Sequence, residues 1–366
     1  MQSKSVLVIG NGGIGRDDQG LFYVNSHIAN FLTELSDDGF AVSYVSPLNP
    51  RVKGQHLQNA AIDTDRVGII AINTANAVHK LLSIIRLYIH VLRADACYIF
   101  YPGTVGKLVA KICRMSKTPY GLYVRGALFD ETDVTFDHAD FILTVSPSLT
   151  ETFRDRVPRV DTIRPMNDLT QADRAYRKPL DEAPETWSLL YVGNIARDKG
   201  VNELLEAAQE LKAQNLPFHL TMVGGGQLFD SLSTHVETTG LASHVTMTGL
   251  ISDKTELMSY YERADLFVFP TYHEGFPRVL YEAMIKGVPI ITTMVGGIPG
   301  RMVDNENCIA IPIQSAAAIE EAILKLTSDL KLTHAIGEAG QATTLQILDH
   351  ARHHHDLVEE CLKALS

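Results

Sequence analysis

The stretch that decides the fold of this 366-residue chain is "PTYHEGFPRVLYEAMIKGVPIITTMVGGIPG", residues 270–300. An apolar strand ends at Pro270, Glu274 follows in a loop, and Pro277 predicts the first turn of a helix that carries Glu282. The start of a helix exposes backbone N–H groups and the positive end of the helix dipole, which together bind anions. The two carboxylates would then flank an anion, which suits a ligand with phosphate in its middle and hydroxyls at both ends. Taken alone, Glu274 and Glu282 would be interpreted as two solvated surface charges. Whether they bind a ligand therefore depends on the patterns in the rest of the chain.

Around this stretch, short apolar runs alternate with amphipathic helical patterns. Helical patterns cover residues such as 201–213 and 318–328. The runs that predict buried strands in the second half are 188–193, 218–224, 244–249, 265–270, 288–293 and 308–312. This alternation predicts a parallel sheet that is covered by helices.

The first half repeats the rhythm, with helical patterns over 21–35 and 77–92. Its predicted strands are 6–9, 41–45, 67–72, 97–100, 120–124 and 141–145. Residues 156–186 are polar and contain prolines, which is typical of a linker. The fold class is therefore α/β, with two Rossmann-like doubly wound domains over 1–165 and 166–345. Ligands of such sheets bind at the carboxyl ends of the strands, and a cleft between two such domains is the expected site.

Composition and charge exclude several classes of protein. The chain is 45% hydrophobic and 20% charged, with a net charge of −11. Residues 1–165 are nearly balanced, whereas 166–366 hold 15 basic against 27 acidic residues, which argues against nucleic-acid binding. No run reaches the ~18 apolar residues of a membrane span, and the first residues do not resemble a signal peptide. We expect a cytoplasmic protein, peripheral at the inner face of the membrane at most.

The opening run "VLVIGNGGIG", residues 6–15, contains the spacing G-x-G-x-x-G, which raises the alternative of an NAD-dependent oxidoreductase. That fingerprint requires a helix directly after the turn and an acidic residue at the end of the second strand. Here "RDDQG" delays the helix until about Leu21, and Ser46 stands where the acid is needed. The glycines still allow a close approach of backbone to a ligand, so Gly12 and Gly13 either line a sugar or phosphate or only form the turn.

The stretch 270–300 resembles the donor-binding signature of glycosyltransferase family 4, retaining sugar transferases of the GT-B fold. The family pattern runs E-G-F-x-x-V-x-x-E-A-M-x-x-G-x-P-V-I and then G-G-I-P. Three further pieces agree in order and spacing, and they are "YVGNIARDKGVNELLEA" (191–207), "MVGGG" (222–226) and "VTMTGLISDKTELMSYYERADLFVFPT" (245–271). Looser matches are "YVRGALFD" (123–130), "ADFILTVSPSLTETF" (139–153) and "IRPMNDL" (163–169).

This resemblance implies an organisation and an activity. An N-terminal domain, 1–165, would bind the acceptor, and a C-terminal domain, 166–345, would bind a nucleotide-sugar donor that is linked to UDP or GDP. A C-terminal helix, about 343–365, would cross back so that 346–366 pack on the first domain. The enzyme would transfer a hexose-type sugar to a glycan or a lipid-linked acceptor in polysaccharide or glycoconjugate biosynthesis.

The resemblance also implies roles for the residues around the predicted helix. Glu282 would bind the ribose hydroxyls of the donor, and Glu274 would hold hydroxyls of the transferred sugar. The backbone of Gly275, Phe276 and Pro277 would face the diphosphate, with the helix start behind it.

The loop after the first strand of the second domain departs from the family. Lys199 matches the phosphate-binding lysine, but the family has G-R where this chain has Gly193 and Asn194. Arg197, three positions later, either replaces the missing guanidinium or is a surface residue. Gly297, in the G-G-I-P piece, is expected to line the same pocket.

Charge builds on the departing phosphate during sugar transfer, so fixed cations aimed at it lower the barrier. A protein cation makes a metal unnecessary, and we expect neither a metal nor any other cofactor. The one D-x-D match, Asp63 to Asp65, precedes a strand and is read as a loop coincidence. Arg125, in "YVRGALFD", stands where the first domain of such enzymes faces the donor sugar, and either acts in catalysis or makes an ion pair or helix cap.

Residues 78–117 combine apolar helix faces with seven Lys and Arg residues against the single acid Asp95. A basic amphipathic surface suits peripheral contact with anionic lipid, and buried helices with solvated basic edges are the alternative. The run "DHARHHHD", residues 349–356, is interpreted as part of a helix and not as a metal site. A third hypothesis beside the sugar transferase and the oxidoreductase is an inactive nucleotide-sugar-binding protein, which Asn194 favours.

Overall fold

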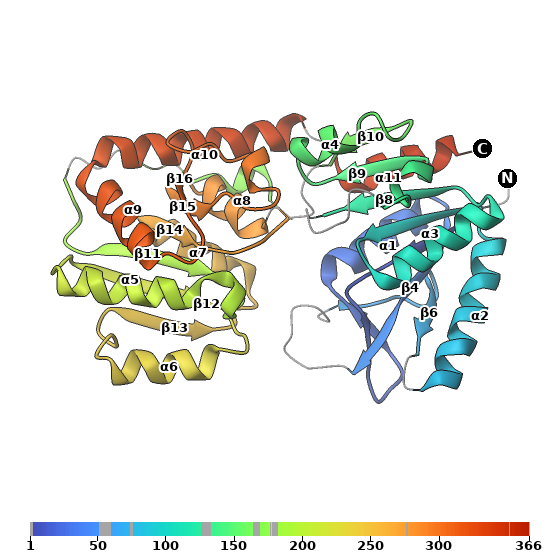
Figure 1. The fold of residues 1–366 in the computed structure, drawn as a ribbon, viewed down its shortest axis with the longest axis horizontal. Helices are drawn as coiled ribbons and strands as arrows, with labels where there is room; N and C mark the ends of the chain where they lie inside the picture. Colours follow the sequence, from blue (N-terminus) through green and yellow to red (C-terminus); the bar gives the residue numbers. More distant parts are fainter. Residues whose placement is uncertain are drawn as a thin grey trace. The chain divides into compact units, whose positions relative to one another are not determined.

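The computed structural model describes residues 3–50, 60–73, 76–125, 133–163, 169–175, 177, 182–275, 277–350 and 352–365. The chain forms two compact units (Figure 1). The first unit is Met1–Asn167 with Arg352–Ser366, and the second is Asp168–Ala351. The chain therefore changes unit at 167/168 and 351/352, where the sequence predicts 165/166 and 345/346.

The first unit is built on a parallel sheet with the strand order β10-β9-β8-β7-β1-β4, and β6 also pairs with β4. Its strands are β1 (Ser5–Ile9), β4 (Ala41–Pro50), β6 (Gly68–Ile72), β7 (Ala96–Tyr101), β8 (Tyr120–Val124), β9 (Phe141–Thr144) and β10 (Val160–Thr162). The apolar runs of the first half are thus confirmed as strands. The linker predicted over 156–186 is wrong at its start, because β10 within it is an edge strand of this sheet.

Helices cover both faces of the first sheet, which explains why its strands are apolar throughout. Val6 and Val8 of β1 belong to a core with α1 (Ser26–Asp37) and α11 (His354–Ala364). Their neighbours Leu7 and Ile9 face the opposite core, with α2 and α3. The remaining helices are α2 (Ala77–Arg93), α3 (Thr104–Ser116), and the short α4 (Pro147–Phe153) beside β9 and β10.

The glycine-rich turn after β1 does not lead into a helix. It continues into β2 (Ile14–Arg16) and β3 (Phe22–Val24), and β3 pairs with β5 (Ala60–Ala61). Helix α1 begins only at Ser26, where the Asn25 side chain accepts a hydrogen bond from the His27 N–H. The helix start predicted at about Leu21 is therefore wrong, and the turn lacks the helix N-terminus that a dinucleotide fingerprint requires.

The second unit has a parallel sheet with the order β13-β12-β11-β14-β15-β16. The strands are β11 (Trp187–Val192), β12 (Phe218–Val223), β13 (Val245–Gly249), β14 (Leu266–Phe269), β15 (Ile290–Thr293) and β16 (Ile309–Ile311). The helices are α5 (Val201–Ala213), α6 (Phe229–Thr238), α7 (Lys254–Arg263), α8 (Arg278–Ile285), α9 (Ala316–Ser328) and α10 (Leu330–His350). All six predicted strands are confirmed, and so are the helical patterns at α5 and α9.

The C-terminal segment is two helices and not one helix over 343–365. Helix α10 packs on α8 in the second unit, and α11 packs on α1 in the first. His354, at the start of α11, is 3% exposed, stacks on the ring of Phe31 and shares a 2.7 Å hydrogen bond with the hydroxyl of Tyr98. Burial lowers the pKa of His354 to about 3, with smaller contributions from nearby basic groups. This histidine is therefore a neutral core residue.

Candidate functional site

The acidic loop of the second unit connects β14 to α8. The helix begins at Arg278, and Pro277 precedes it in extended conformation, with φ −72° and ψ 136°. Pro277 is thus the N-cap residue of α8. The sequence predicts it in the first turn, and that prediction is wrong by one position. Its side chain has no oxygen that could accept from the first N–H groups of the helix, so the helix start is suited to an external anion. Phe276 lies outside the described residues.

The loops that follow β11, β14 and β15 meet at the carboxyl edge of the second sheet, because these three strands are neighbours. The N–H of Tyr272 donates to the carbonyl of Asp198 at 2.9 Å, which joins the acidic loop to the loop after β11. The N–H of Gly297 donates to the carbonyl of Gly275 at 2.7 Å, which joins it to the loop after β15. The backbone of the acidic loop is therefore held from both sides.

Two glycines make these close approaches sterically possible. Gly200, with φ +68°, ends the turn η4 (Arg197–Lys199), and a Cβ there would lie 2.1 Å from the carbonyl oxygen of Pro270. Gly296, with φ +57°, precedes the turn η5 (Ile298–Gly300), and its Cβ would lie 1.7 Å from the carbonyl oxygen of Glu274. Both positions exclude a side chain by conformation and by contact. Gly296 is a site-forming residue for which the sequence reasoning assigned no role.

Lys199 and Glu274, predicted from separate motifs, form one ion pair. Lys199 Nζ donates to Glu274 Oε1 at 2.5 Å, and the side chains are 16% and 22% exposed. Asp198 Oδ2 lies 3.6 Å from the same ammonium. The structure thus places a partly buried cation and a carboxylate close together at the carboxyl edge of the sheet.

Glu282, half-buried in the middle of α8, is held by a tyrosine from a neighbouring helix. The hydroxyl of Tyr261, on α7, donates to Glu282 Oε2 at 2.8 Å. Burial raises the pKa of Tyr261 well above its usual value, and the charge of Glu282 raises it further, so the phenol stays a donor. Glu282 lies four residues beyond Arg278, which is about 6 Å along the helix axis. No sequence pattern indicates Tyr261, because the contact joins residues 21 positions apart.

Arg197 and Asn194 are exposed, and Arg197 lines a pocket beside α5 and α6. This pocket of about 830 Å³ also contains Glu203, whose Oε1 accepts from the Tyr272 hydroxyl at 2.6 Å. The structure therefore places Arg197 near Tyr272 and Glu203, while Lys199 of the same turn pairs with Glu274. Gly193 donates its N–H to the carbonyl of Val223 at 3.0 Å.

The sequence-predicted residues of the first unit gather at the carboxyl ends of β1, β7 and β8. An Arg125 guanidinium nitrogen donates to Asn11 Oδ1 at 2.6 Å, and the Asn11 amide donates to the carbonyl of Pro102. Gly12 is exposed, and among the described residues no atom lies within 4 Å of a Cβ built there. Gly13, with φ +78°, packs against the side chain of Asn49. The loop thus brings an arginine and an open glycine together.

Asp63 belongs to a local turn that follows β5. Its Oδ1 accepts from the N–H of Asp65 at 3.0 Å, and its other oxygen lies 3.6 Å from Arg66. Among the described residues, no group of three or more His, Cys, Asp or Glu side chains is arranged to hold a metal ion. Nor does the described part of the chain contain a helix with the length and apolarity to span a bilayer.

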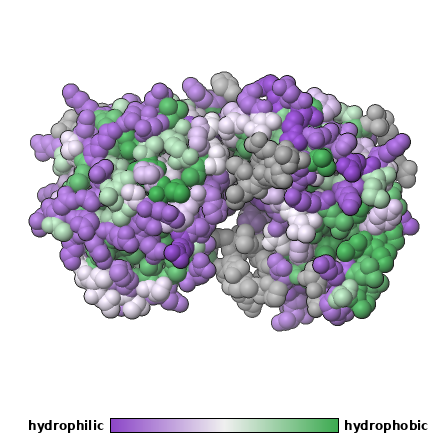
Figure 2. Space-filling view, viewed as in Figure 1, coloured by the Kyte–Doolittle hydropathy of each residue, from purple (hydrophilic) through white to green (hydrophobic). Residues whose placement is uncertain are grey.

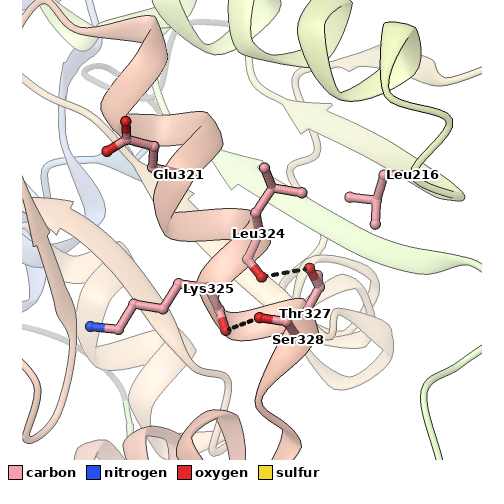
Figure 3. Close-up of a pocket in the computed structure, with 6 residues that line it drawn as sticks. All are labelled: Leu216, Glu321, Leu324, Lys325, Thr327 and Ser328. Carbon is pink, nitrogen blue, oxygen red and sulfur yellow. Dashed lines mark hydrogen bonds between the residues drawn. The ribbon is translucent and has the colours of Figure 1, made fainter.

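A second pocket, of about 550 Å³, lies on the last turns of α9, away from this edge of the sheet (Figure 3). Its residues are Leu216, Glu321, Leu324, Lys325, Thr327 and Ser328. The hydroxyls of Thr327 and Ser328 donate to backbone carbonyls of α9 at 3.2 and 3.1 Å. Because these polar groups are used within the helix, the pocket offers a ligand little specific recognition.

The second unit therefore combines, at the carboxyl edge of a doubly wound sheet, a helix start without a side-chain cap, a lysine and two carboxylates that are held by hydrogen bonds. Residues 173–343 match the family model described as glycosyl transferases group 1. Over these residues the chain matches the group 1 glycosyltransferases, which confirms the family that the motifs indicate at that level. Membership of family 4 within the group stays a prediction.

Two relatives with curated names are also glycosyltransferases, and each matches less than half of this chain. The chain is 31% identical over 175 residues to the capsular polysaccharide biosynthesis glycosyltransferase CapM of Staphylococcus aureus, covering 48% of this chain and 44% of that protein. It is 35% identical over 138 residues to a putative teichuronic acid biosynthesis glycosyltransferase, TuaC, of Bacillus subtilis, covering 37% and 32%. The chain thus spans less than half the length of these relatives. The comparisons do not support the oxidoreductase alternative.

Solved structures share the fold over nearly the whole chain. The Anabaena protein Alr3699/HepE, solved in complex with UDP, is 15% identical with a TM-score of 0.68 and covers 99% of this chain and 100% of its own. Sucrose-phosphate synthase from Thermosynechococcus elongatus is 19% identical with a TM-score of 0.65, covering 94% and 95%. The predicted fold class, GT-B with two Rossmann-like units, is confirmed.

Proposed function

We propose that the protein is a retaining glycosyltransferase that takes a hexose-type sugar from a UDP- or GDP-linked donor. The single observation that carries the proposal is the arrangement around the start of α8, with the Lys199–Glu274 pair before it and Glu282 within it. The shared fold of the Anabaena protein, which has been solved with UDP and with UDP-glucose, supports a nucleotide-sugar donor.

The proposed roles follow from charge and position. The diphosphate binds at the helix start, against the backbone of Gly275 and Pro277. Lys199 neutralises phosphate charge, and Glu282 accepts hydrogen bonds from the ribose hydroxyls. Glu274 accepts hydrogen bonds from hydroxyls of the transferred sugar. Gly193, Asn194 and Gly297 line the pocket from the neighbouring loops, and Arg197 supplies further positive charge.

The proposed reaction breaks the bond between the anomeric carbon and the β-phosphate oxygen. The acceptor hydroxyl forms the new bond on the same face of the sugar, and its proton passes to the departing phosphate. Lys199 lowers the barrier because negative charge on that phosphate grows as the bond breaks. This chemistry requires no metal, and neither a metal nor any other cofactor is proposed. The catalytic role of Arg125 stays a prediction.

The acceptor is proposed to be a glycan or a lipid-linked sugar that binds the first unit, at the loop of Gly12 and Gly13, where Gly12 is exposed and Gly13 packs against Asn49. The names of the relatives, which concern capsular polysaccharide and teichuronic acid, support a role in polysaccharide or glycoconjugate biosynthesis. The protein would act in the cytoplasm, at the inner face of the membrane.

A thermal-shift screen of the full chain against UDP-, GDP- and ADP-sugars tests the donor site. A donor at 100-fold excess over its Kd adds about 2.7 kcal/mol to stability, which gives a clear increase in Tm. We expect the increase with one nucleotide and its loss in the variant Glu282→Ala. Equal responses of wild type and variant to every nucleotide-sugar would overturn the proposed site.

Release of nucleotide from the bound donor then separates the enzyme from an inactive binding protein, the alternative that Asn194 favours. We expect release above background, with or without acceptor sugars, and no change when EDTA is added. Binding without release would support the inactive alternative. Loss of release in EDTA that manganese restores would contradict metal independence.

A further inference from the structure

Helix α2 of the first unit presents large apolar side chains to solvent. Within the described residues, its outer surface holds seven of them, each between 41% and 65% exposed. They are Val78, Leu81, Leu82, Ile85, Tyr88, Ile89 and Leu92. Single exposed apolar residues are common on protein surfaces, but a contiguous set marks an interaction site. Figure 2 shows this set as a continuous hydrophobic area where Figure 1 draws α2.

The exposed set lies opposite the side of α2 that packs on the sheet. The buried residues are Ser83, Leu87 and Val91, at intervals of four. With 100° between successive residues, the two sets centre about 160° apart around the helix axis. A helix that is apolar on two opposite faces is typical of one that is enclosed on both sides. Within the described residues, the protein core encloses one face of α2 and leaves the other exposed to solvent, where an apolar environment would stabilise it.

The surroundings of this apolar face are basic. Helix α2 contains Lys80, Arg86 and Arg93 and no acidic residue. Helix α3 packs beside α2 and adds the exposed residues Lys111 and Arg114 near its end. Lys107 of α3 is paired with Asp133 at 3.0 Å and is not counted. An external partner of this surface must therefore be apolar and also negatively charged.

We propose that α2, together with the basic end of α3, binds an anionic lipid bilayer, with the apolar face of α2 at the boundary between headgroups and acyl chains. Such a helix inserts its apolar side to a depth of about 5–10 Å and attracts anionic headgroups with its flanking cations. A second copy of the chain fits less well. A two-fold interface places the same patch of each copy against the other, which would bring the basic residues of α2 and α3 together, and neither helix contains an acid to neutralise them.

Cosedimentation of the full chain with lipid vesicles tests this surface without donor or acceptor, so the result is independent of the proposed sugar transfer. We expect binding to vesicles that contain phosphatidylglycerol, release at high salt, and little binding to pure phosphatidylcholine. The variant Arg86→Gln/Arg93→Gln should bind about 25-fold more weakly, because each cation near an anionic surface contributes about a fivefold factor. The variant Leu82→Gln/Ile89→Gln should bind more than about tenfold more weakly.

The matched control is Leu250→Gln/Ile313→Gln, which changes two residues of similar exposure in the second unit. It should bind vesicles as the wild type does. All the changed side chains are exposed, so each variant should keep the wild-type Tm. If Leu82→Gln/Ile89→Gln fails to fold, the variant Leu81→Gln/Leu92→Gln takes its place.

Two results would overturn the proposal. One is wild-type binding that does not depend on anionic lipid or on these residues. The other is a stable dimer in sedimentation velocity that binds no vesicles and that Leu82→Gln/Ile89→Gln separates into monomers. The second result would assign the apolar face to a second copy of the chain.

Discussion

The carboxyl edges of the two parallel sheets are built differently. In the second unit, backbone hydrogen bonds join the acidic loop to both neighbouring loops, and the Lys199–Glu274 pair joins two of them again. In the first unit, the described contacts of the opening loop are fewer, and Gly12 is open to solvent. An edge with many cross-links fixes charged groups for a ligand of constant shape, whereas an open edge can receive ligands that vary. The family match over 173–343 lies in the cross-linked unit.

The largest expected effect is at Lys199. The change Lys199→Ala should lower kcat by about two orders of magnitude, because the growing phosphate charge would lose the cation proposed for it and Glu274 loses its partner. The measurement is nucleotide release under saturating donor. Lys331→Ala, at an exposed position of α10, is the matched control and should leave kcat unchanged. A wild-type kcat for Lys199→Ala would show that the cross-link is structural.

Alanine at two glycines compares the two edges directly. Gly296→Ala should lower the free energy of unfolding by about 2 kcal/mol or more, because φ is +57° and the new Cβ meets the carbonyl oxygen of Glu274. Gly12→Ala should change it by less than about 0.5 kcal/mol, since the space beside Gly12 is open among the described residues. Chemical denaturation measures both. Equal effects would remove the distinction between a packed and an open edge.

Acid should weaken the first unit more than the second. The pKa of His354 is lowered from 6.5 to about 3 by burial in the first unit, so the unfolded state binds the proton more readily than the folded state. Stability is then full above about pH 6.5 and falls by about 1.4 kcal/mol per unit as the pH drops towards 3. At pH 5 the loss is about 2 kcal/mol relative to pH 7.

Denaturant unfolding at the two pH values checks this prediction, with probes that report on each unit. The variant His354→Gln cannot take up the proton, so its first unit should lose less stability between pH 7 and pH 5. A loss of the same size in wild type and variant would assign the acid effect to other groups.

Most strands were predictable because each is a short apolar run between polar or glycine-containing turns, and burial on both faces of a parallel sheet requires such runs. The hairpin of β2 and β3 was not predictable, because residues 21–35 also fit a helical period. The break between α10 and α11 was also missed, because no proline or glycine marks it. The local sequence pattern thus predicts most elements, but it does not show where β3 ends and α1 begins, or where α10 ends and α11 begins.

The candidate site likewise contains residues that the sequence predicts and contacts that it does not predict. Glu274, Glu282 and Lys199 could be selected because they belong to motifs with fixed spacing next to strand ends. The direction of Arg197 could not be predicted, because it depends on α5 and Tyr272, which pack beside the turn. Contacts between separate elements, such as the one between Tyr261 and Glu282, leave no periodic signal in the sequence.

The smallest expected effect tests whether such a contact positions a ligand-binding group. Tyr261→Phe removes the hydroxyl that donates to Glu282, and a hydrogen bond to a charged group contributes about 1.5 kcal/mol, so the donor KM should rise about tenfold. We expect kcat to stay close to wild type, because the ribose that Glu282 is proposed to bind would lie away from the bond that breaks. Tyr260→Phe, on the same helix, is the matched control. A fall in kcat with unchanged KM would show that Tyr261 acts on the reaction by another route, and equal KM values for both variants would show that Glu282 is positioned without it.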